Sequence, residues 1–185
     1  MGKRGNIDGI ARYGILSGEE IGELIQRDPP LISGFADLET QLQPNGFDLT
    51  IEEIRMFANA GSLGKLNADR VLPDLELVHP GDRGFIALPP GPYHITYAET
   101  VAIPSDLMAF GRPRSSLTRG GVAIHTAVWD AGYVGRSTSL LVVSNPFGFR
   151  VERGARVAQL VFARLSRPVD HGYAGVYQGE NIKLK

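Results

Sequence analysis

The sequence predicts an all-β fold with short helices, a distorted antiparallel jelly roll formed by a single domain over residues 1–185. Short apolar segments alternate with turn signals about every ten residues, which is the pattern of a sandwich or jelly roll. The chain contains 23 glycines and 12 prolines, residue types that this class of fold uses in its many turns. Its 185 residues are enough to bury a hydrophobic core.

The first expected elements are an arm and a helix. Residues 1–13 are expected to form a loose N-terminal arm. A helix is predicted to begin at Ser17, a good N-cap whose capping-box partner is Glu20. Pro29 and Pro30 end it, because proline lacks the N–H group that a helix interior needs. The apolar residues of this helix share one face, which consists of Ile21, Leu24 and Ile25.

The next segment has a mixed pattern. A turn is predicted at residues 41–46, followed by a short strand at 47–51. Residues 52–66 fit either a strand followed by a loop or a weak helix, and the sequence leaves both interpretations open.

From residue 81 the pattern is that of β-structure. Stiff turns are predicted at 89–92 and 145–148, and residues 107–110 lead into a central stretch. The tail, residues 171–185, has too little apolar content for a core strand and is predicted to be a mobile flap. The predicted strands are 84–88, 94–97, 100–103, 139–144, 150–152 and 155–165.

The central stretch begins at residues 111–121, GRPRSSLTRGG, which concentrate three arginines and three hydroxyls between glycines. Arginine offers planar bidentate donors, and serine offers a short hydroxyl and a backbone N–H. One interpretation is a single helical turn, closed by glycine, that binds an oligophosphate. The other is a basic surface turn. The sequence also leaves open whether Arg112 or Arg114 contacts phosphate.

Residues 122–136, VAIHTAVWDAGYVGR, alternate like a strand and then turn at 130–132. A hairpin beside the anion site is therefore expected. Asp130 at its tip is either a turn former or a carboxylate that holds and deprotonates water. Trp129 and Tyr133 flank it as core aromatics, unless Tyr133 instead packs against a sugar ring.

Three further polar residues have open roles. His125 is interpreted as structural, since no second histidine or carboxylate lies at metal-ligand spacing. Asp48 is interpreted as a turn residue. Gln159 lies within an alternating strand, where its amide needs a partner, either backbone or phosphate.

The composition excludes several functional classes. The chain has no cysteine, which excludes disulfides, Cys-based zinc sites and thiol nucleophiles. Its formal net charge is -1, so no overall basic field indicates nucleic acid. No membrane span, secretory signal, P-loop or Rossmann glycine pattern is found. The sequence therefore predicts a cytoplasmic protein that binds neither nucleic acid nor a membrane.

Five motifs in order resemble the dCTP deaminase and trimeric dUTPase superfamily, most closely its archaeal-type dUTPases. The similarity covers nearly the whole chain and includes the start at residues 15–17 and the first helix. The matching segments are QPNGFDL at 43–49, GRPRSSLTR at 111–119 with Pro113 as an unusual insert, HTAVWDAGYVG at 125–135, GARVAQL at 154–160 and YQG at 177–179.

This resemblance implies a dUTPase-like β-clip fold, assembled as a homotrimer with active sites between subunits. It implies that Asp130 activates water, that the backbone of 124–129 binds the pyrimidine, and that the tail closes over the nucleotide. Mg²⁺ would be bound by the substrate phosphates, with Asp48 at most an indirect contact. The implied substrate-binding residues are Arg114, Ser115, Ser116, Leu117, Thr118, Arg119, His125, Tyr133, Gln159, Tyr173, Tyr177, Gln178 and Lys183.

One departure separates the branches of this family. Deaminases carry a glutamate on the strand after the hairpin, where this sequence has Leu140, and residues 136–150 contain no carboxylate. An apolar side chain cannot transfer protons. We therefore expect a dUTP diphosphatase that hydrolyses dUTP to dUMP and pyrophosphate by attack of water on the α-phosphate. The alternatives are a dCTP deaminase, alone or combined with dUTPase activity, and a non-catalytic nucleotide-binding module.

Overall fold

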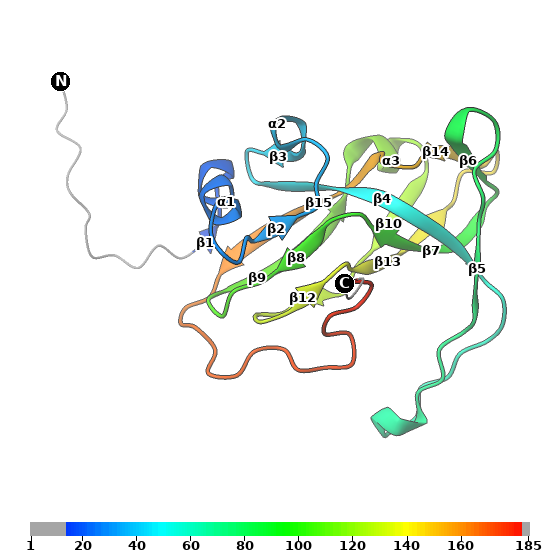
Figure 1. Ribbon diagram of the computed structural model, residues 1–185. Coiled ribbons are helices and arrows are strands. Elements are labelled where there is room, and N and C mark those ends of the chain that lie inside the picture. Colours follow the sequence, from blue (N-terminus) through cyan, green and yellow to red (C-terminus); the bar gives the residue numbers. More distant parts are fainter. Residues whose placement is uncertain (1–13, 183–185) are drawn as a thin grey trace.

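The computed structural model describes residues 14–182, so the predicted N-terminal arm lies outside the described residues (Figure 1). As predicted, the fold is mostly β-structure with short helices. The largest sheet is antiparallel, with strand order β10-β13-β7-β4-β15-β9-β11, and β1, β3 and β5 pair at its sides. Its strands are β1 (Gly14–Ile15), β3 (Leu42–Gln43), β4 (Gly46–Phe57), β5 (Leu75–Leu77), β7 (Gly91–Tyr97), β9 (Leu107–Pro113), β10 (Val122–His125), β11 (Val128–Trp129), β13 (Thr138–Val143) and β15 (Arg156–Arg164).

Two smaller antiparallel sheets complete the fold. One has the order β12-β8-β2, and the other pairs β14 with β6. Their strands are β2 (Ile32–Ser33), β8 (Thr100–Ala102), β12 (Val134–Gly135), β6 (Phe85–Leu88) and β14 (Phe149–Glu152). The helical elements are α1 (Gly18–Ile25), α2 (Leu38–Gln41), α3 (Ser115–Arg119), and the 3-10 turns η1 (Asn67–Asp69) and η2 (Asp82–Gly84). None of the helices in residues 14–182 is long and apolar enough to span a membrane.

Helix α1 confirms the predicted capping box. The backbone N–H of Glu20 donates to the Ser17 hydroxyl at 3.3 Å, and the backbone N–H of Ser17 donates to the Glu20 carboxylate at 3.1 Å. Two N–H groups that would lack partners at the helix start are thereby satisfied. The predicted apolar face, Ile21, Leu24 and Ile25, is buried.

The largest difference from the predicted elements is in β4. The predicted turn at 41–46 is confined to Pro44 and Asn45, because α2 and β3 occupy the preceding residues. β4 continues to Phe57, so the strand-and-loop interpretation of 52–66 is correct and the weak helix is wrong. Residues 58–74 then form a long arm that projects from the body of the molecule (Figure 1).

The strands predicted after residue 81 are all present. β7 begins at Gly91, inside the predicted turn at 89–92, and the other ends agree closely. Residues 166–182 form neither a helix nor a strand, which confirms the prediction that the tail adds no core strand.

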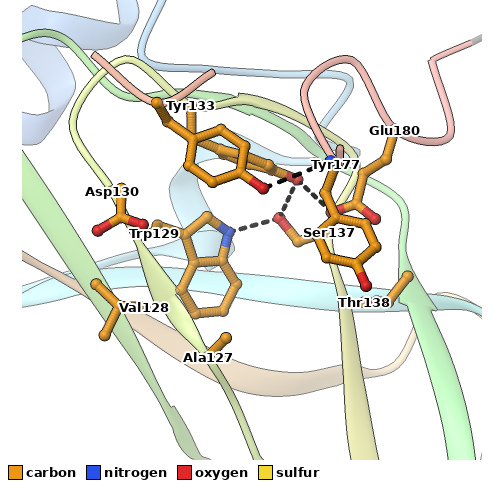
Figure 2. A pocket seen from close by; sticks show the side chains of 10 residues that line it. Ala127, Val128, Trp129, Asp130, Tyr133, Ser137, Thr138, Tyr177 and Glu180 are labelled. Carbon is orange, nitrogen blue, oxygen red and sulfur yellow. Dashed lines mark hydrogen bonds between the residues drawn. The ribbon is translucent and has the colours of Figure 1, made fainter. Parts of the chain in front are cut away.

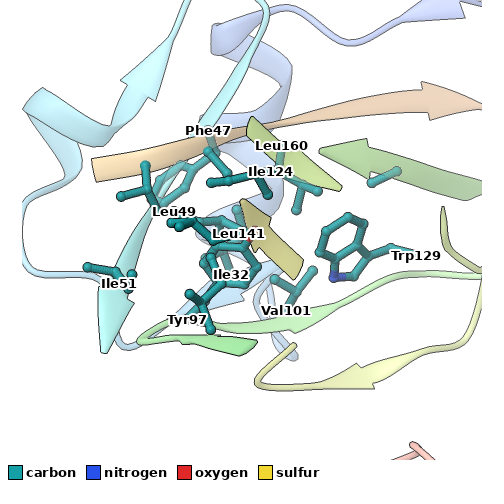
Figure 3. Close-up of a cluster of buried hydrophobic side chains, with 14 of the residues drawn as sticks. Ile32, Phe47, Leu49, Ile51, Tyr97, Val101, Ile124, Trp129, Leu141 and Leu160 are labelled. Carbon is teal, nitrogen blue, oxygen red and sulfur yellow. The ribbon is translucent and has the colours of Figure 1, made fainter. Parts of the chain in front are cut away.

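The hydrophobic core forms around β4 and the strands that pair with it. Alternate residues of β4, among them Phe47, Leu49 and Ile51, are fully buried, as is Leu160 on β15. Figure 3 shows these side chains together with Tyr97 and Trp129. Burial of each such side chain stabilises the fold by about 1.5–3 kcal/mol. The core therefore holds β4, β9 and β15 rigidly, and these strands carry or flank the candidate site.

A buried polar cluster joins α2, β4 and the turn before β8. Glu99 is completely buried and accepts hydrogen bonds from Gln41 Nε2 at 2.7 Å, Thr50 Oγ1 at 2.7 Å and Thr50 N at 2.9 Å. Burial raises the pKa of Glu99, and the hydrogen bonds from Thr50 and Gln41 oppose this rise. Gln41, predicted to begin a turn, is therefore a buried link between elements.

Candidate functional site

Residues 115–119 of the basic stretch form one short helix after β9, which agrees with the first of the two interpretations left open by the sequence. Arg114 precedes α3 in an extended conformation, and Gly120 ends it with its N–H bonded to the carbonyls of Ser116 and Leu117. Leu117 is buried and anchors the helix to the core. The remaining predicted ligands on α3, which are Ser115, Ser116, Thr118 and Arg119, are exposed.

Asp48 lies inside the protein beside this helix, so its interpretation as a turn residue is wrong. It belongs to β4 and is buried, with Oδ2 at 2.9 Å from Arg114 Nε and 3.4 Å from Arg156 Nη1. Burial raises the pKa of Asp48, while the two guanidinium groups limit the rise. Because this carboxylate is paired with two arginines, Asp48 is poorly placed to bind a metal ion.

Gln159 lies on the neighbouring strand, opposite Asp48 on β4 and Arg112 on β9. Its amide has no hydrogen-bond partner among the side chains and backbone groups of residues 14–182, and it is partly exposed. The amide lies against Gly46, where an added Cβ would be 2.9 Å from Gln159 Nε2. The first, second and fourth motif segments therefore meet at one corner of the sheet.

The turn at Asp130 does not form the predicted β-hairpin. β11 before the turn pairs with β9, whereas β12 after it pairs with β8 in another sheet. The turn is tight, because Tyr133 N donates to Asp130 O at 3.1 Å and Gly132 has a φ of +86°. This positive φ favours glycine. Asp130 itself is exposed.

A cavity of about 300 Å³ opens beside this turn (Figure 2), which is within the range of small-ligand sites. Trp129 and Tyr133 form apolar walls, and Asp130 lies at its margin. The full lining consists of Ala127, Val128, Trp129, Asp130, Tyr133, Ser137, Thr138, Tyr173, Tyr177 and Glu180. This combination suits a ligand with an aromatic or sugar ring and one polar reacting group.

Two lining residues that the sequence analysis missed connect the aromatic walls. Trp129 Nε1 donates to the Ser137 hydroxyl, which lies 3.0 Å from the Tyr133 hydroxyl, and Tyr133 donates to Glu180 Oε1 at 2.8 Å (Figure 2). Burial raises the pKa of both Tyr133 and Glu180. No local sequence signal marks Ser137 or Glu180, because both contacts depend on how distant segments pack.

The tail is docked along residues 131–136. Tyr173 N donates to Ala131 O at 2.7 Å, and the Gln178 amide bonds both Gly132 O and Val134 N. The ring of Tyr173 packs edge-on against that of Tyr133, with centroids 5.8 Å apart. Tyr173 and Tyr177 line the cavity, whereas Gln178 bonds the adjoining turn. The fourth predicted tail ligand, Lys183, lies outside the described residues.

Two groups of predicted ligands remain apart in a single chain. Trp129 lies opposite Ala109 on β9, and Arg114 comes five residues after Ala109 along the chain. At about 3.3 Å per residue this separation is roughly 17 Å. Within the chain, the anion-binding candidates around Arg114 are therefore separated along β9 from the cavity at Asp130.

His125 is exposed at the end of β10, opposite Leu140 on β13, which in turn lies opposite His94 on β7. Burial lowers the pKa of His94. In the described part of the chain, no three histidine or acidic side chains are arranged to hold a metal ion. Position 140, which lies between these two histidines in the sheet, therefore carries an apolar side chain rather than an acid.

The chain is similar to known proteins both in sequence and in fold. A family model described as dCTP deaminase-like matches residues 15–165. The chain is 48% identical over 167 residues to a Methanosarcina mazei protein and 49% identical over 168 residues to one from Archaeoglobus fulgidus, both named probable deoxyuridine 5'-triphosphate nucleotidohydrolase. These matches cover 90% and 91% of this chain, and 98% of each relative.

Among solved structures, a 2'-deoxycytidine 5'-triphosphate deaminase from Agrobacterium tumefaciens superposes with a TM-score of 0.63 at 23% identity. The match covers 83% of this chain and 49% of that protein, so this chain spans about half its length. The similarity shows a common fold.

Proposed function

The chain belongs to the dCTP deaminase-like family, and from this premise we propose that it hydrolyses dUTP to dUMP and pyrophosphate. The observation that carries the proposal is the similarity, at 44–49% identity over nine-tenths of the chain, to five archaeal relatives named for this activity. The exposed carboxylate of Asp130 at a cavity of suitable size supplies the chemistry.

In the proposed reaction Asp130 accepts a proton from a water molecule. The water oxygen bonds to the α-phosphorus as the bond from that phosphorus to the bridging oxygen breaks, and pyrophosphate leaves. Arg114 and Arg119 stabilise the negative charge that moves onto the leaving group, and Gln159 donates to a phosphate oxygen. A divalent metal ion, Mg²⁺, bound to the phosphates, would neutralise part of the same charge.

The separation of roughly 17 Å along β9 between Ala109, which lies opposite Trp129, and Arg114 supports a site shared between subunits. A neighbouring copy would supply Arg114, α3 and Gln159 to the cavity that this chain forms with Asp130. We propose the homotrimer expected from the family, in which each subunit contributes both halves to different sites.

Leu140 favours this function over deamination. A deaminase needs a group at the base that transfers protons, and the row His125, Leu140 and His94 places an apolar side chain there. Cytosine would also present an inverted hydrogen-bond pattern to a site formed for uracil, which leaves buried groups unpaired.

The decisive experiment is a pyrophosphate-release screen over dUTP, dCTP, dTTP and UTP, with ammonia measured in parallel. We expect turnover of dUTP and no ammonia from dCTP. Asp130→Asn should retain nucleotide binding and lose hydrolysis by about 10²-fold or more. Ammonia release comparable to dUTP cleavage would instead show a deaminase, and dUTP binding in calorimetry without pyrophosphate would show a non-catalytic module.

A further inference from the structure

The side chains around the cavity form one continuous hydrogen-bonded chain from the tail to the core. Glu180 belongs to the docked tail, Tyr133 and Ser137 follow the Asp130 turn, and Trp129 directly precedes Asp130. The three contacts join Glu180 to Tyr133, Tyr133 to Ser137, and Ser137 to Trp129. Trp129 and Ser137 are buried, so neither has water as an alternative partner.

The direction of this chain follows from the number of hydrogens. Indole nitrogen is only a donor, so Trp129 must donate to Ser137. The single hydroxyl hydrogen of Tyr133 is given to Glu180, so Ser137 must give its own hydrogen to Tyr133. All three bonds therefore point toward the Glu180 carboxylate, and such aligned bonds strengthen one another.

The backbone is shaped to accommodate this arrangement. A Cβ added at Gly135 would overlap the Tyr133 hydroxyl and would lie 3.2 Å from Glu180 Cγ. The tail also bonds at Glu180 and on both sides of it: Gly179 N donates to Val134 O at 2.8 Å, Arg136 N donates to Glu180 O at 2.9 Å, and Asn181 Nδ2 donates to Arg136 O at 2.8 Å. The carboxylate is thus fixed opposite Tyr133.

We propose that Glu180 is a positioning residue that couples docking of the tail to the orientation of Tyr133 and Trp129 beside Asp130. When the tail is docked, Glu180 holds the Tyr133 hydroxyl, and Ser137 then holds the indole of Trp129. When Glu180 is absent, Ser137 and Trp129 remain but Tyr133 loses its acceptor. The effect on turnover rests on the proposed function, whereas the effect on the aromatic walls does not.

The first test uses the nucleotide-free protein and the fluorescence of Trp129, which is the single tryptophan of the chain. Glu180→Ala should shift the emission maximum to longer wavelength, because an undocked tail admits water to the cavity. Glu180→Gln keeps an acceptor oxygen for Tyr133 and should retain the parental emission. Asp170→Ala, which removes an exposed carboxylate from the segment leading to the tail, is the matched control and should also retain it.

The second test is steady-state hydrolysis of dUTP by the same variants. Glu180→Ala should lower kcat by about 10-fold or more, since displaced catalytic groups reduce rates steeply. The KM should change less than kcat, because the phosphate-binding residues are untouched. Glu180→Gln should recover most of the rate, and Asp170→Ala should match the parent.

Parental emission and parental kcat in Glu180→Ala would overturn the proposal, as would equal impairment of the Ala and Gln variants. Tyr133→Phe cuts the same chain without altering the tail sequence, and an emission spectrum like that of Glu180→Ala is expected. An unchanged spectrum in Tyr133→Phe would also overturn the proposal. If the parent released no pyrophosphate from dUTP while its emission responded as expected, the proposed function alone would fail.

Discussion

Asp48 determines how Arg114 is presented to a ligand. It binds the guanidinium through Nε, and Arg114 Nη1 donates to Arg156 O at 3.4 Å. Within residues 14–182, Arg114 Nη2 has no partner, so one nitrogen of a fixed guanidinium group is left for phosphate. Arg112, which precedes Pro113 in the chain, is exposed and has no ion pair with the residues that the structure describes. Arg114 is therefore the better candidate for the phosphate contact.

Replacing Asp48 by asparagine should destabilise the protein. The change leaves Arg114 and Arg156 without their shared counter-charge, and breaking a buried pair on one side is strongly destabilising. Because both arginines are about one-third exposed, we expect a loss of about 1–3 kcal/mol in the free energy of unfolding. Urea unfolding measures this loss.

Glu53→Gln is the matched control for Asp48→Asn, because Glu53 pairs with Arg55 in a partly exposed ion pair. Such pairs contribute about 0–1 kcal/mol. An equal loss of stability in the two variants would show that the buried ion pair of Asp48 contributes no more to the free energy of unfolding than the partly exposed pair of Glu53.

At the scale of elements, the turn around Asp130 was predicted correctly and its pairing was not. Periodicity indicates which residues of a strand face the core, but it does not identify the partner strand. β11 and β12 enter different sheets, and the tail then covers the segment between them. The capping box at Ser17 was predicted correctly because it depends on a local signal, since Glu20 is only three residues away.

Removal of residues 173–185 should slow turnover without dissociating the proposed homotrimer. The deletion removes Tyr173 and Glu180, which line the cavity, and Gln178, which bonds the Asp130 turn. We expect kcat for dUTP to fall by about 10-fold or more. Size-exclusion chromatography with light scattering would establish that assembly is retained.

A shorter truncation that removes only residues 184 and 185 provides the control, because Lys183, Glu180 and the bonds of Gln178 to Gly132 and Val134 remain. This variant should keep most of the parental rate. Equal rates for the long truncation and the parent would exclude a role of the tail in closing the site.

At the scale of the whole molecule, the fold class and most strands can be predicted from sequence patterns that span about ten residues. The polar contacts that organise the site cannot be predicted from such local patterns. Tyr133 donates to Glu180 across 47 residues of the chain, and Thr50 donates to Glu99 across 49 residues. Such contacts depend on tertiary packing, which propensity and periodicity do not encode. A site divided between subunits was implied by the family resemblance, whereas the spacing of the motifs along one chain does not indicate which parts of the surface each subunit would supply.

The buried carboxylate of Glu99 should make global stability depend on pH. Its pKa is raised in the folded protein, so the folded state binds more protons than the unfolded state above the ordinary pKa of about 4.5. The stabilisation is fully present below that value and is lost as pH rises through the folded pKa. When Glu99 is protonated, the Thr50 hydroxyl can reverse its role and accept from it at 2.7 Å.

Glu99→Gln removes this titration and also breaks part of the cluster. The new amide nitrogen is a donor, and it must face other donors: either Thr50 N, or Gln41 Nε2 and Thr50 Oγ1. The variant should therefore be less stable than the parent at low pH, and the difference should shrink as pH rises above the ordinary glutamate pKa and through the raised pKa of Glu99 in the folded protein. Chemical unfolding at fixed protein concentration, repeated across this range, measures both curves. A difference that is independent of pH would show that Glu99 titrates identically in the folded and unfolded states.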